Sequence, residues 1–487
     1  MASSHLRSVP GQSDTDVGVL DTGILFAYLA LMVGLGFYAQ RRQKNIEDYF
    51  VAGRRMGPLT IACLWLAAWI GGAAVVGTSS RVYEFGVTGV WYVLAQAIGC
   101  LLFGLFMAAR VKQLGDRHKH LTYPDFIEQN YDSRTRIVAT ITTVLAFTAY
   151  TAGQLAASAT ILQVLLGWDY DIALLLAGAI VILYTAVGGY LAVTYTDWVQ
   201  VALLLLGVVA VGIPVAISQA GSWADMHAAL PASYYDLGAQ GWGRITALVV
   251  SMVLSFFVGM DSFSRCFAAR DPAAARNGTL LAIFLILPLA VASAWLGLAC
   301  ATIYPDHTAS AGILTTFVLD AFPVGLKGLM VIGILSAIMS TADICILTAS
   351  ANYTRDIHQR YIQPDIGPGA MLRLGTLASA AAGGLAMLMA WKMRDIIDIL
   401  QLGFTINSAA LFLPTIAAIY WNHVSAAAAF WSISLSLATV IGWRIAADAG
   451  IGGPFTIDPL WPGLLVSAGL LLVLTTVRPR HVAKAPA

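Results

Sequence analysis

The sequence predicts an all-α polytopic membrane protein, and its composition and its long apolar runs both lead to this fold class. Of its 487 residues, 59% are hydrophobic and only 11% are charged, whereas about a quarter of the residues in an ordinary soluble protein are charged. The mean hydropathy is +0.77. Most of the chain is therefore expected to lie within a lipid bilayer.

Apolar runs that are long enough to cross a bilayer recur thirteen times. A transmembrane helix needs about 20 mostly apolar residues. The runs begin near residues 18, 57, 86, 134, 170, 192, 243, 279, 311, 370, 396, 424 and 458. Residues 1–16 are polar and lack a signal-peptide pattern, so we expect a disordered tail, a single transmembrane domain over 17–480 and a short cytoplasmic tail over 481–487.

The positive charges predict the orientation of the chain. Loops that face the cytoplasm carry an excess of lysine and arginine. With the N-terminus outside, the cytoplasmic loops hold 20 of the 27 lysines and arginines, so we expect an N-out, C-in multi-pass protein of the cell membrane, as in a bacterial inner membrane. Because the basic residues follow the topology and the net charge is only +1, nucleic acid is not an expected partner.

The sequence offers no support for an enzyme. The five cysteines all fall in or at the ends of apolar runs without metal-ligand spacing, which is typical of small buried side chains. His118 and His120 belong to a basic loop, and no HExxH, P-loop or GxGxxG motif occurs.

Three acidic residues in or beside the apolar runs are candidates for function. An aspartate at the centre of a membrane helix costs roughly 2.5 to 3.5 kcal/mol on insertion scales, and Asp343 has no basic neighbour within a helical turn. Asp197 opens the sixth predicted span, where an acid also favours a helix N-terminus. Asp261 precedes Arg265 by four residues, the spacing of an ion pair along one helix face.

The ninth predicted span also carries two adjacent hydroxyls. Ala337, Ser340 and Thr341 share one helix face. Such hydroxyls can bond back to the carbonyl four residues earlier, or they can join carbonyl oxygens around a hard cation. Gly71 and Gly72 in the second span provide a place to interrupt a helix and release carbonyls, although glycine also serves close helix packing.

Four segments together carry a family resemblance. They are DYFVAGRRMGP (Asp48 to Pro58), GGYLAVTYTDWVQ (Gly188 to Gln200), GMDSFSRCFAARD (Gly259 to Asp271) and SAIMSTADICILTASANYTRDI (Ser336 to Ile357). In order and spacing the chain resembles, over residues 18 to 480, the sodium:solute symporter family. That family includes the sodium/proline, sodium/glucose and sodium/pantothenate symporters and the high-affinity choline transporter.

The resemblance implies a LeuT-type core of two inverted five-helix repeats, over about 56–216 and 242–420. Extra spans would cover 18–40, 424–446 and 458–477. Each repeat would begin with a broken helix, in the second and seventh spans. Alternating access would then come from one helix bundle rocking against the other around a site at the middle of the membrane.

The resemblance also implies ion sites, with Na⁺ as the co-transported ion. The shared sodium site of the family maps onto carbonyls of Ala67, Ile70 and Ala337 and hydroxyls of Ser340 and Thr341. A second ion in some members lies near the position of Asp197. Asp343 and Ile344 stand here where members with a demonstrated second ion have serines.

The solute is expected between the second, third, fourth, seventh and eleventh spans. Its candidate contacts are Trp65, Trp69, Gln96, Tyr150, Gln154, Phe257, Asp261, Phe404 and Asn407. Trp69 is the strongest candidate because it adjoins the glycine pair. Trp69 and Tyr150 match aromatic positions of the ammonium cage in the choline transporter, where cation–π contacts hold the ligand.

The expected function is sodium-coupled import of a small polar organic solute, which is an amino acid, a betaine or choline-like molecule, or a carboxylate. A proton-coupled symporter that uses Asp343 or Asp261 is the main alternative. A transporter-like nutrient sensor and an ion-leak channel are further alternatives. The sequence does not define the solute, the sodium stoichiometry or the oligomeric state.

Overall fold

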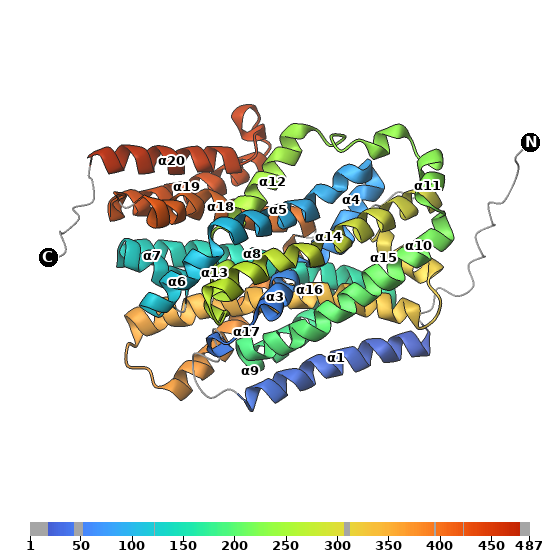
Figure 1. Ribbon diagram of the computed structural model, residues 1–487, viewed down its shortest axis with the longest axis horizontal. Helices are drawn as coiled ribbons and strands as arrows, with labels where there is room; N and C mark the ends of the chain where they lie inside the picture. The colour runs from blue at the N-terminus through green and yellow to red at the C-terminus, as the bar shows by residue number, and fades with distance from the viewer. Residues whose placement is uncertain are drawn as a thin grey trace, which may run out of the picture.

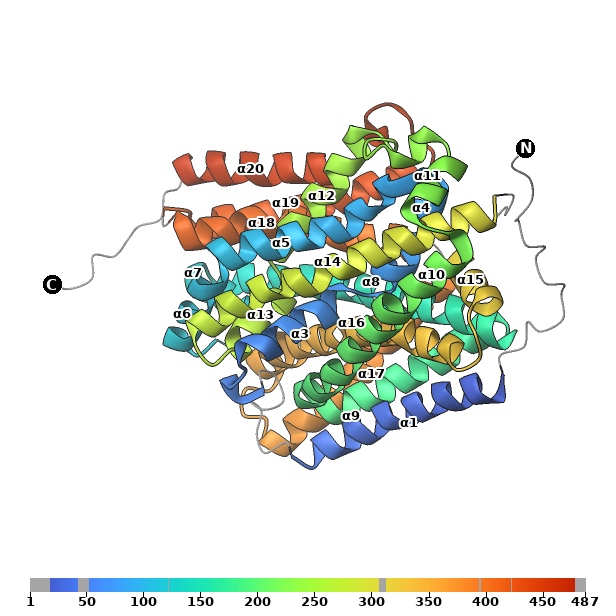
Figure 2. The same ribbon diagram turned by 45° about the vertical axis from the view of Figure 1, so that its right-hand side comes forward.

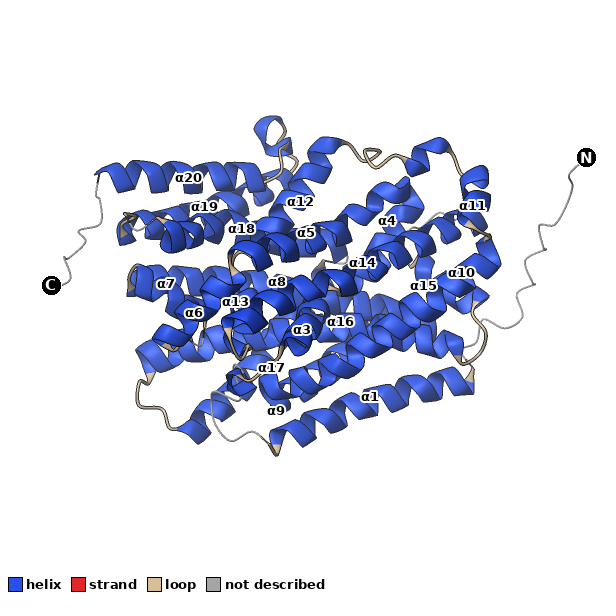
Figure 3. Ribbon diagram, in the orientation of Figure 1, coloured by secondary structure: helices blue, strands red, loops and turns tan. Residues whose placement is uncertain are grey.

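The computed structural model describes residues 18–42, 52–120, 122–305, 312–393, 396–421 and 423–477. Within these ranges the chain is helical throughout (Figure 3), and its β-pairing is limited to one isolated bridge between Met56 and Ala269. The expected all-α class is confirmed. The predicted tails at 1–16 and 481–487 lie outside the described residues, and the predicted domain boundaries stay predictions.

The first half of the chain forms α1 (Val19–Gln40), α3 (Pro58–Trp69), α4 (Thr78–Phe85), α5 (Trp91–Phe106), α6 (Ala108–His118), α7 (Tyr123–Asn130), α8 (Ser133–Leu166), α9 (Tyr170–Leu204), α10 (Ile213–Ala220) and α11 (Trp223–Ala229). Three wider π-helical segments extend neighbouring helices: η2 (Ala73–Gly77), η4 (Leu205–Gly212) and η6 (Asn352–Ile362).

The second half forms α12 (Trp242–Phe256), α13 (Met260–Ala268), α14 (Pro272–Ile303), α15 (Ile313–Ala321), α16 (Leu326–Ala351), α17 (Pro368–Lys392), α18 (Ile396–Tyr420), α19 (Ala426–Asp448) and α20 (Leu460–Val477). Short 3₁₀ turns occur at η1 (Ala52–Arg54), η3 (Gly86–Val90), η5 (Ala232–Tyr235) and η7 (Gly453–Thr456).

Within the described ranges, eleven helices are long and apolar enough to cross a membrane, and two shorter apolar helices accompany them. The stretch Ala73–Phe106 combines the second half of the pass that begins with α3 and the next pass, which contains α5; the two are joined by a turn at Gly86, whose φ is 78°. A kink at Gly189, with φ 58° and ψ −162°, divides α9 into two passes. The succession of helices is thus consistent with the thirteen predicted passes.

Two predicted spans begin elsewhere in the structure. The eighth starts at Pro272 instead of near residue 279, since Asp271 caps the helix by accepting a hydrogen bond from the Ala274 amide. The ninth starts at Leu326 instead of near residue 311, because a turn at Gly325, with φ 87°, separates it from the short helix α15.

The long helices run in roughly the same direction and surround α16 (Figure 1; Figure 2). In the most apolar 18-residue stretch of the pass that contains α16, 94% of the residues are buried, the largest buried share among the candidate spans. α16 packs against α1, α8 and α9, while α19 and α20 lie on the opposite side of the bundle from α1. α1 begins and α20 ends at opposite ends of the bundle, as an odd number of passes requires.

Two helices are interrupted where the family resemblance implied. α3 ends at Trp69, and Ile70 leaves helical geometry with φ −90° and ψ 78°. α12 ends at Phe256, and the chain turns through Gly259, with φ 94°, into α13. The φ of Gly259 favours glycine, and a Cβ atom there would also lie 2.9 Å from Nδ2 of Asn407, which would have to shift.

Three basic residues that the charge count placed in loops are buried instead. Lys112, Arg136 and Arg265 have relative exposures of 1%, 4% and 1%. Each has internal partners; for example, Nζ of Lys112 lies 2.7 Å from Oδ1 of Asp116 and donates to the carbonyl of Phe267. These residues therefore stabilise the end of the bundle that we predict to be cytoplasmic, besides contributing to its charge.

Arg136 ties α7, α8 and η6 together. Its guanidinium pairs with Asp125 at 2.9 Å, with Glu128 and with Asp356. Partial burial by itself raises the pKa of Glu128, but the hydrogen bonds from Ser133 and Arg136 outweigh it and hold this pKa below its usual range. Because the pKa is lowered, this contribution to stability is present above the ordinary glutamate pKa and is lost as pH falls through the lowered value.

The substitution Arg136→Gln should destabilise the protein by about 3–5 kcal/mol, because it leaves the buried carboxylate of Asp356 without a counter-charge. Thermal unfolding of the purified protein in detergent measures this effect. Arg134→Gln is the matched control, because Arg134 is exposed on the same helix. Equal unfolding temperatures for the two variants would contradict the assigned role of Arg136.

Candidate functional site

The interruption of α3 is bridged to α16 by two hydroxyls. The carbonyl of Ala67 accepts hydrogen bonds from Oγ of Ser340 at 2.8 Å and from Oγ1 of Thr341 at 3.0 Å. Both hydroxyls also lie 3.1 Å from the carbonyl of Ala337. Thr341 thus bonds back to the carbonyl four residues earlier, as one interpretation of the sequence expected, and both hydroxyls also contact a second helix. Ile70 follows directly at the interruption.

The chemistry of this cluster suits a small hard cation. Its atoms are carbonyl and hydroxyl oxygens, which are hard ligands of the kind that alkali and alkaline-earth cations take. The two hydroxyls have one proton each, while the cluster offers four contacts between hydroxyl and carbonyl oxygens. The oxygens therefore present more acceptor capacity than the hydroxyl protons can satisfy.

Two amide side chains hold the backbone on the far side of the interruption. Nε2 of Gln96 on α5 donates to the carbonyl of Trp69 at 2.8 Å. Oε1 of Gln154 on α8 accepts from the amide of Gly72, also at 2.8 Å. Gln96 was predicted to contact the solute, but its side chain forms a hydrogen bond to the backbone of α3.

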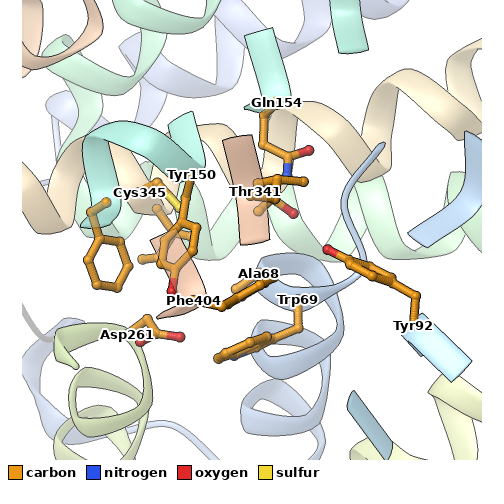
Figure 4. A pocket seen from close by; sticks show the side chains of 12 residues that line it. Ala68, Trp69, Tyr92, Tyr150, Gln154, Asp261, Thr341, Cys345 and Phe404 are labelled. Atoms are coloured by element: carbon orange, nitrogen blue, oxygen red, sulfur yellow. The ribbon is translucent and has the colours of Figure 1, made fainter. Parts of the chain in front are cut away.

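A cavity with about 380 Å³ of empty space adjoins the oxygen cluster (Figure 4). Its lining residues come from α3, α5, α8, α13, α16 and α18: Ala68, Trp69, Tyr92, Phe147, Tyr150, Gln154, Asp261, Thr341, Ile344, Cys345, Leu400 and Phe404. In Figure 4, Asp261 and Trp69 lie below, whereas Gln154 and Thr341 lie above. Thr341 belongs both to the cavity wall and to the oxygen cluster.

Aromatic rings form one wall of the cavity. The ring of Trp69 stacks on Phe256, with centroids 3.6 Å apart, and lies nearly parallel to Phe404, with centroids 5.8 Å apart. Phe404 in turn lies 4.9 Å from the ring of Tyr150. The faces of such rings attract cations, so this wall suits a solute with an apolar body or a positive charge.

Asp261 provides the negative charge at the cavity. It lies in the first turn of α13, and its Oδ2 is 3.6 Å from Nη1 of Arg265, the ion pair that the spacing predicted. Nη1 of Arg265 also donates to the backbone carbonyl of Asp261, and Nε donates to the carbonyl of Leu64 at 2.9 Å. Arg265 thus links α13 to α3 and partly balances the acid.

Five of the nine predicted solute contacts line the cavity: Trp69, Tyr150, Gln154, Asp261 and Phe404. The other four support its walls from behind. Trp65 stacks on Phe256 at 5.6 Å, and Phe257 meets Phe103 edge-on at 5.9 Å. Asn407 donates from Nδ2 to Oγ of Ser255 at 3.3 Å, and Gln96 binds the Trp69 carbonyl as described above.

Several lining residues escaped the sequence prediction, and helix spacing could have found some of them. Ile344 and Cys345 follow Thr341 by three and four residues, so they share its helix face. Leu400 precedes Phe404 by four residues, for the same reason. Tyr92 precedes the predicted Gln96 by four residues, and Phe147 precedes the predicted Tyr150 by three, so the same spacing could have found them too.

A second polar cluster lies between α1, α9 and α16. Asp197 and Asp343 are both buried and interact electrostatically. Oδ2 of Asp343 accepts from the Tyr184 hydroxyl at 3.0 Å, while Oδ1 of each acid has no hydrogen-bond partner among the described residues. Asp197 does not open a helix as predicted. It lies within α9, well past the kink at Gly189.

This combination defines a class of protein. Paired interrupted helices at the middle of a membrane bundle, next to a cluster of buried oxygens and a cavity, are the arrangement of a secondary transporter. The sequence model of the sodium:solute symporter family matches residues 49–435. The chain belongs to this family, and the expectation of a sodium-coupled symporter of a small organic solute, located in the cell membrane, is confirmed.

Relatives match over most of their own length. The chain is 25% identical to a sodium/proline symporter of Escherichia coli K12 over 435 residues, which cover 86% of each chain. It is 26% identical to a sodium/pantothenate symporter of the same strain over 465 residues, covering 92% of this chain and 95% of that one. The family and these relatives are transporters rather than enzymes.

Solved structures support the fold. A Na⁺-coupled sialic acid symporter in a substrate-bound, outward-open state superposes with a TM-score of 0.81 at 20% identity, covering 96% of this chain and all of that one. A nucleobase-cation-symport-1 family transporter in a closed conformation gives a TM-score of 0.53 at 16% identity, with 89% and 96% coverage. At these identities the likeness concerns the fold, and the LeuT-type arrangement is confirmed.

The substitution Gly71→Ala should weaken sodium binding. A Cβ atom at this position would lie 2.5 Å from Oε1 of Gln154. The side-chain amide of Gln154 must then move away from the backbone N–H of Gly72, from which it accepts a hydrogen bond. We expect the sodium concentration for half-maximal thermal stabilisation of the purified protein to rise about tenfold. Gly34→Ala is the control, because a Cβ there meets nothing within 4 Å. An unchanged sodium dependence in Gly71→Ala would contradict the importance of this contact.

Proposed function

We propose that Na⁺ binds between α3 and α16, at the carbonyls of Ala67, Ile70 and Ala337 and the hydroxyls of Ser340 and Thr341. The observation that carries this proposal is the approach of both hydroxyls to the Ala67 carbonyl across two helices. An ion at this point links the interrupted helix to the most buried helix of the bundle. Binding of the ion therefore depends on the position of α3 relative to α16.

Coupling to the solute follows from the shared wall. Thr341 belongs to both sites, and Trp69 lies between Ala67 and the interruption. Sodium can favour one conformation only by as much as it binds that conformation more tightly. Entry of one net charge adds about 2.3 kcal/mol of driving force per 100 mV of membrane potential, so one sodium per cycle suffices to concentrate a neutral solute.

The cavity favours a solute with an amine or ammonium group. Asp261 lines it together with aromatic faces, and none of the lining residues is a lysine or an arginine. An amino acid, a betaine or a choline-like molecule fits these groups better than a solute with only a carboxylate. The relatives named above carry proline and pantothenate, and proline has both an amine and a compact apolar ring.

We propose a second cation site at Asp197 and Asp343. Both acids are buried and each has an oxygen without a partner among the described residues. Two carboxylates in an apolar interior need either a counter-charge or protons that neutralise them, and a cation between α9 and α16 would supply the counter-charge. Uptake that proceeds without sodium and follows a proton gradient would instead assign the coupling to protons.

The substitutions Ser340→Ala and Thr341→Ala should each raise the sodium concentration for half-maximal uptake about tenfold or more, because each removes one ligand oxygen. The assay is uptake into proteoliposomes of proline, choline, betaine and pantothenate, under an inward sodium gradient compared with potassium. Thr439→Ala is the control, since that exposed hydroxyl bonds only to its own helix, at the Leu435 carbonyl. Unchanged sodium dependence in both test variants would refute the site.

The substitution Asp261→Asn should change the affinity for a solute according to the charge that the solute carries. For a solute with an amine or ammonium group, removal of the carboxylate charge should raise the half-saturating concentration about tenfold. The sodium dependence of thermal stabilisation should stay unchanged, since Asp261 does not belong to the oxygen cluster. Equal affinity of the variant and the wild type for such a solute would show that another group recognises it.

A further inference from the structure

A second hollow lies at the end of the bundle that we predict to be extracellular. It holds about 1100 Å³ of empty space, between the start of α12, the start of α18, the end of α19, η7 and the start of α20. Figures 1 and 2 both show η7 next to the beginning of α12. The residues that carry its chemistry are Arg244, Gln401, Arg444, Asp458 and Trp461.

This hollow is separate from the central cavity. Both use α18, but through different faces: Leu400 and Phe404 line the central cavity, whereas Gln401 and Thr405 line the outer hollow. Successive residues of a helix are turned by about 100°, so the two pairs lie on adjacent faces. α18 thus forms a wall between the two spaces.

The charged residues that line the hollow are Arg244, Arg444 and Asp458. Arg244 on α12 is exposed and forms no ion pair or hydrogen bond within the described ranges. Arg444 on α19 adds a second guanidinium, whose Nε lies 2.9 Å from Oδ2 of Asp448 in an ion pair along the same helix. Because Arg444 is paired with Asp448, the guanidinium of Arg244 is the group that attracts an anion to this hollow.

The acid in the hollow is already used by the protein. Oδ2 of Asp458 accepts from Nε2 of Gln401 at 2.9 Å, and Oδ1 accepts from the amide of Leu460 at 2.9 Å. These bonds fix the start of α20 and connect it to α18. Asp458 therefore fixes the positions of α18 and α20 beside the hollow. The guanidinium of Arg244 has its hydrogen-bond donors available for a ligand.

We propose that this hollow binds a small carboxylate anion from the extracellular side. The planar fork of an arginine matches the two oxygens of a carboxylate, and the hydroxyl of Thr405 in the wall offers a further donor. No part of the central cavity takes part in this binding.

Such an anion would regulate transport, a consequence that rests on the proposed function. α12 leads into the interruption at Gly259, and α18 carries Phe404 over Trp69. A ligand that contacts both helices from outside therefore connects two elements that border the solute. Because alternating access moves such elements relative to one another, the anion shifts the balance between conformations without competing for the central cavity.

Trp461 lines the hollow and reports its occupancy. The purified full-length protein in nanodiscs, in potassium buffer without sodium or solute, is titrated with succinate at constant ionic strength while tryptophan fluorescence is followed. We expect a saturable change that is lost in Trp461→Phe. In Arg244→Gln the half-saturating concentration should rise about tenfold, whereas Lys392→Gln, an exposed cation on α17 away from the hollow, should behave as wild type.

Several results would overturn the site, and none of them depends on sodium coupling. They are the absence of a saturable change in the wild type, an equal response to chloride or sulfate, and the same titration in Arg244→Gln as in the wild type. A weakened titration in Asp261→Asn would also overturn it, since succinate would then bind in the central cavity. Unfolding temperatures confirm that each variant is folded. Calorimetric titration of Trp461→Phe should still detect succinate binding.

Discussion

The rest of the structure depends on satisfying the backbone where α3 is interrupted inside the membrane. Hydrocarbon offers no hydrogen bonds, so each exposed amide or carbonyl there costs several kcal/mol. Side chains from other helices form these hydrogen bonds instead. Hydroxyls of α16 bind the Ala67 carbonyl, and the side-chain amides of Gln96 and Gln154 bind the backbone at Trp69 and Gly72. The interruption therefore fixes the positions of α5, α8 and α16 around itself.

The same constraint produces the functional geometry. Carbonyls released from helical bonding become available to a cation, and the residues next to them form the cavity wall. The helices pack so closely here that there is no room for a larger side chain than glycine, since a Cβ atom on Gly72 would lie 2.7 Å from Ala157 and 2.9 Å from Ile338. Movement of α3 against α16 would thus alter the proposed ion site and the cavity wall together, which we propose as the physical basis of coupling.

The sequence predicted those parts of the site that follow from spacing along one helix. The face shared by Ala337, Ser340 and Thr341 and the Asp261–Arg265 pair are of this kind, and the glycine pair marked the interruption. The sequence alone could not predict contacts between helices that lie far apart in the chain. Nothing in the letters indicates that Gln96 binds a carbonyl of α3, that Arg136 is buried among three acids, or that Asp197 lies inside a kinked helix, because these depend on tertiary packing.

The central claim is that sodium binds at the interruption and joins α3 to α16. Hydrogen exchange of the backbone amides over residues 67–74, measured on the purified protein in sodium and in potassium at equal ionic strength, tests it directly. The account predicts that sodium slows exchange in this segment and that Thr341→Ala abolishes most of the difference. Equal exchange in the two salts, or a sodium effect that persists unchanged in Thr341→Ala, would contradict it.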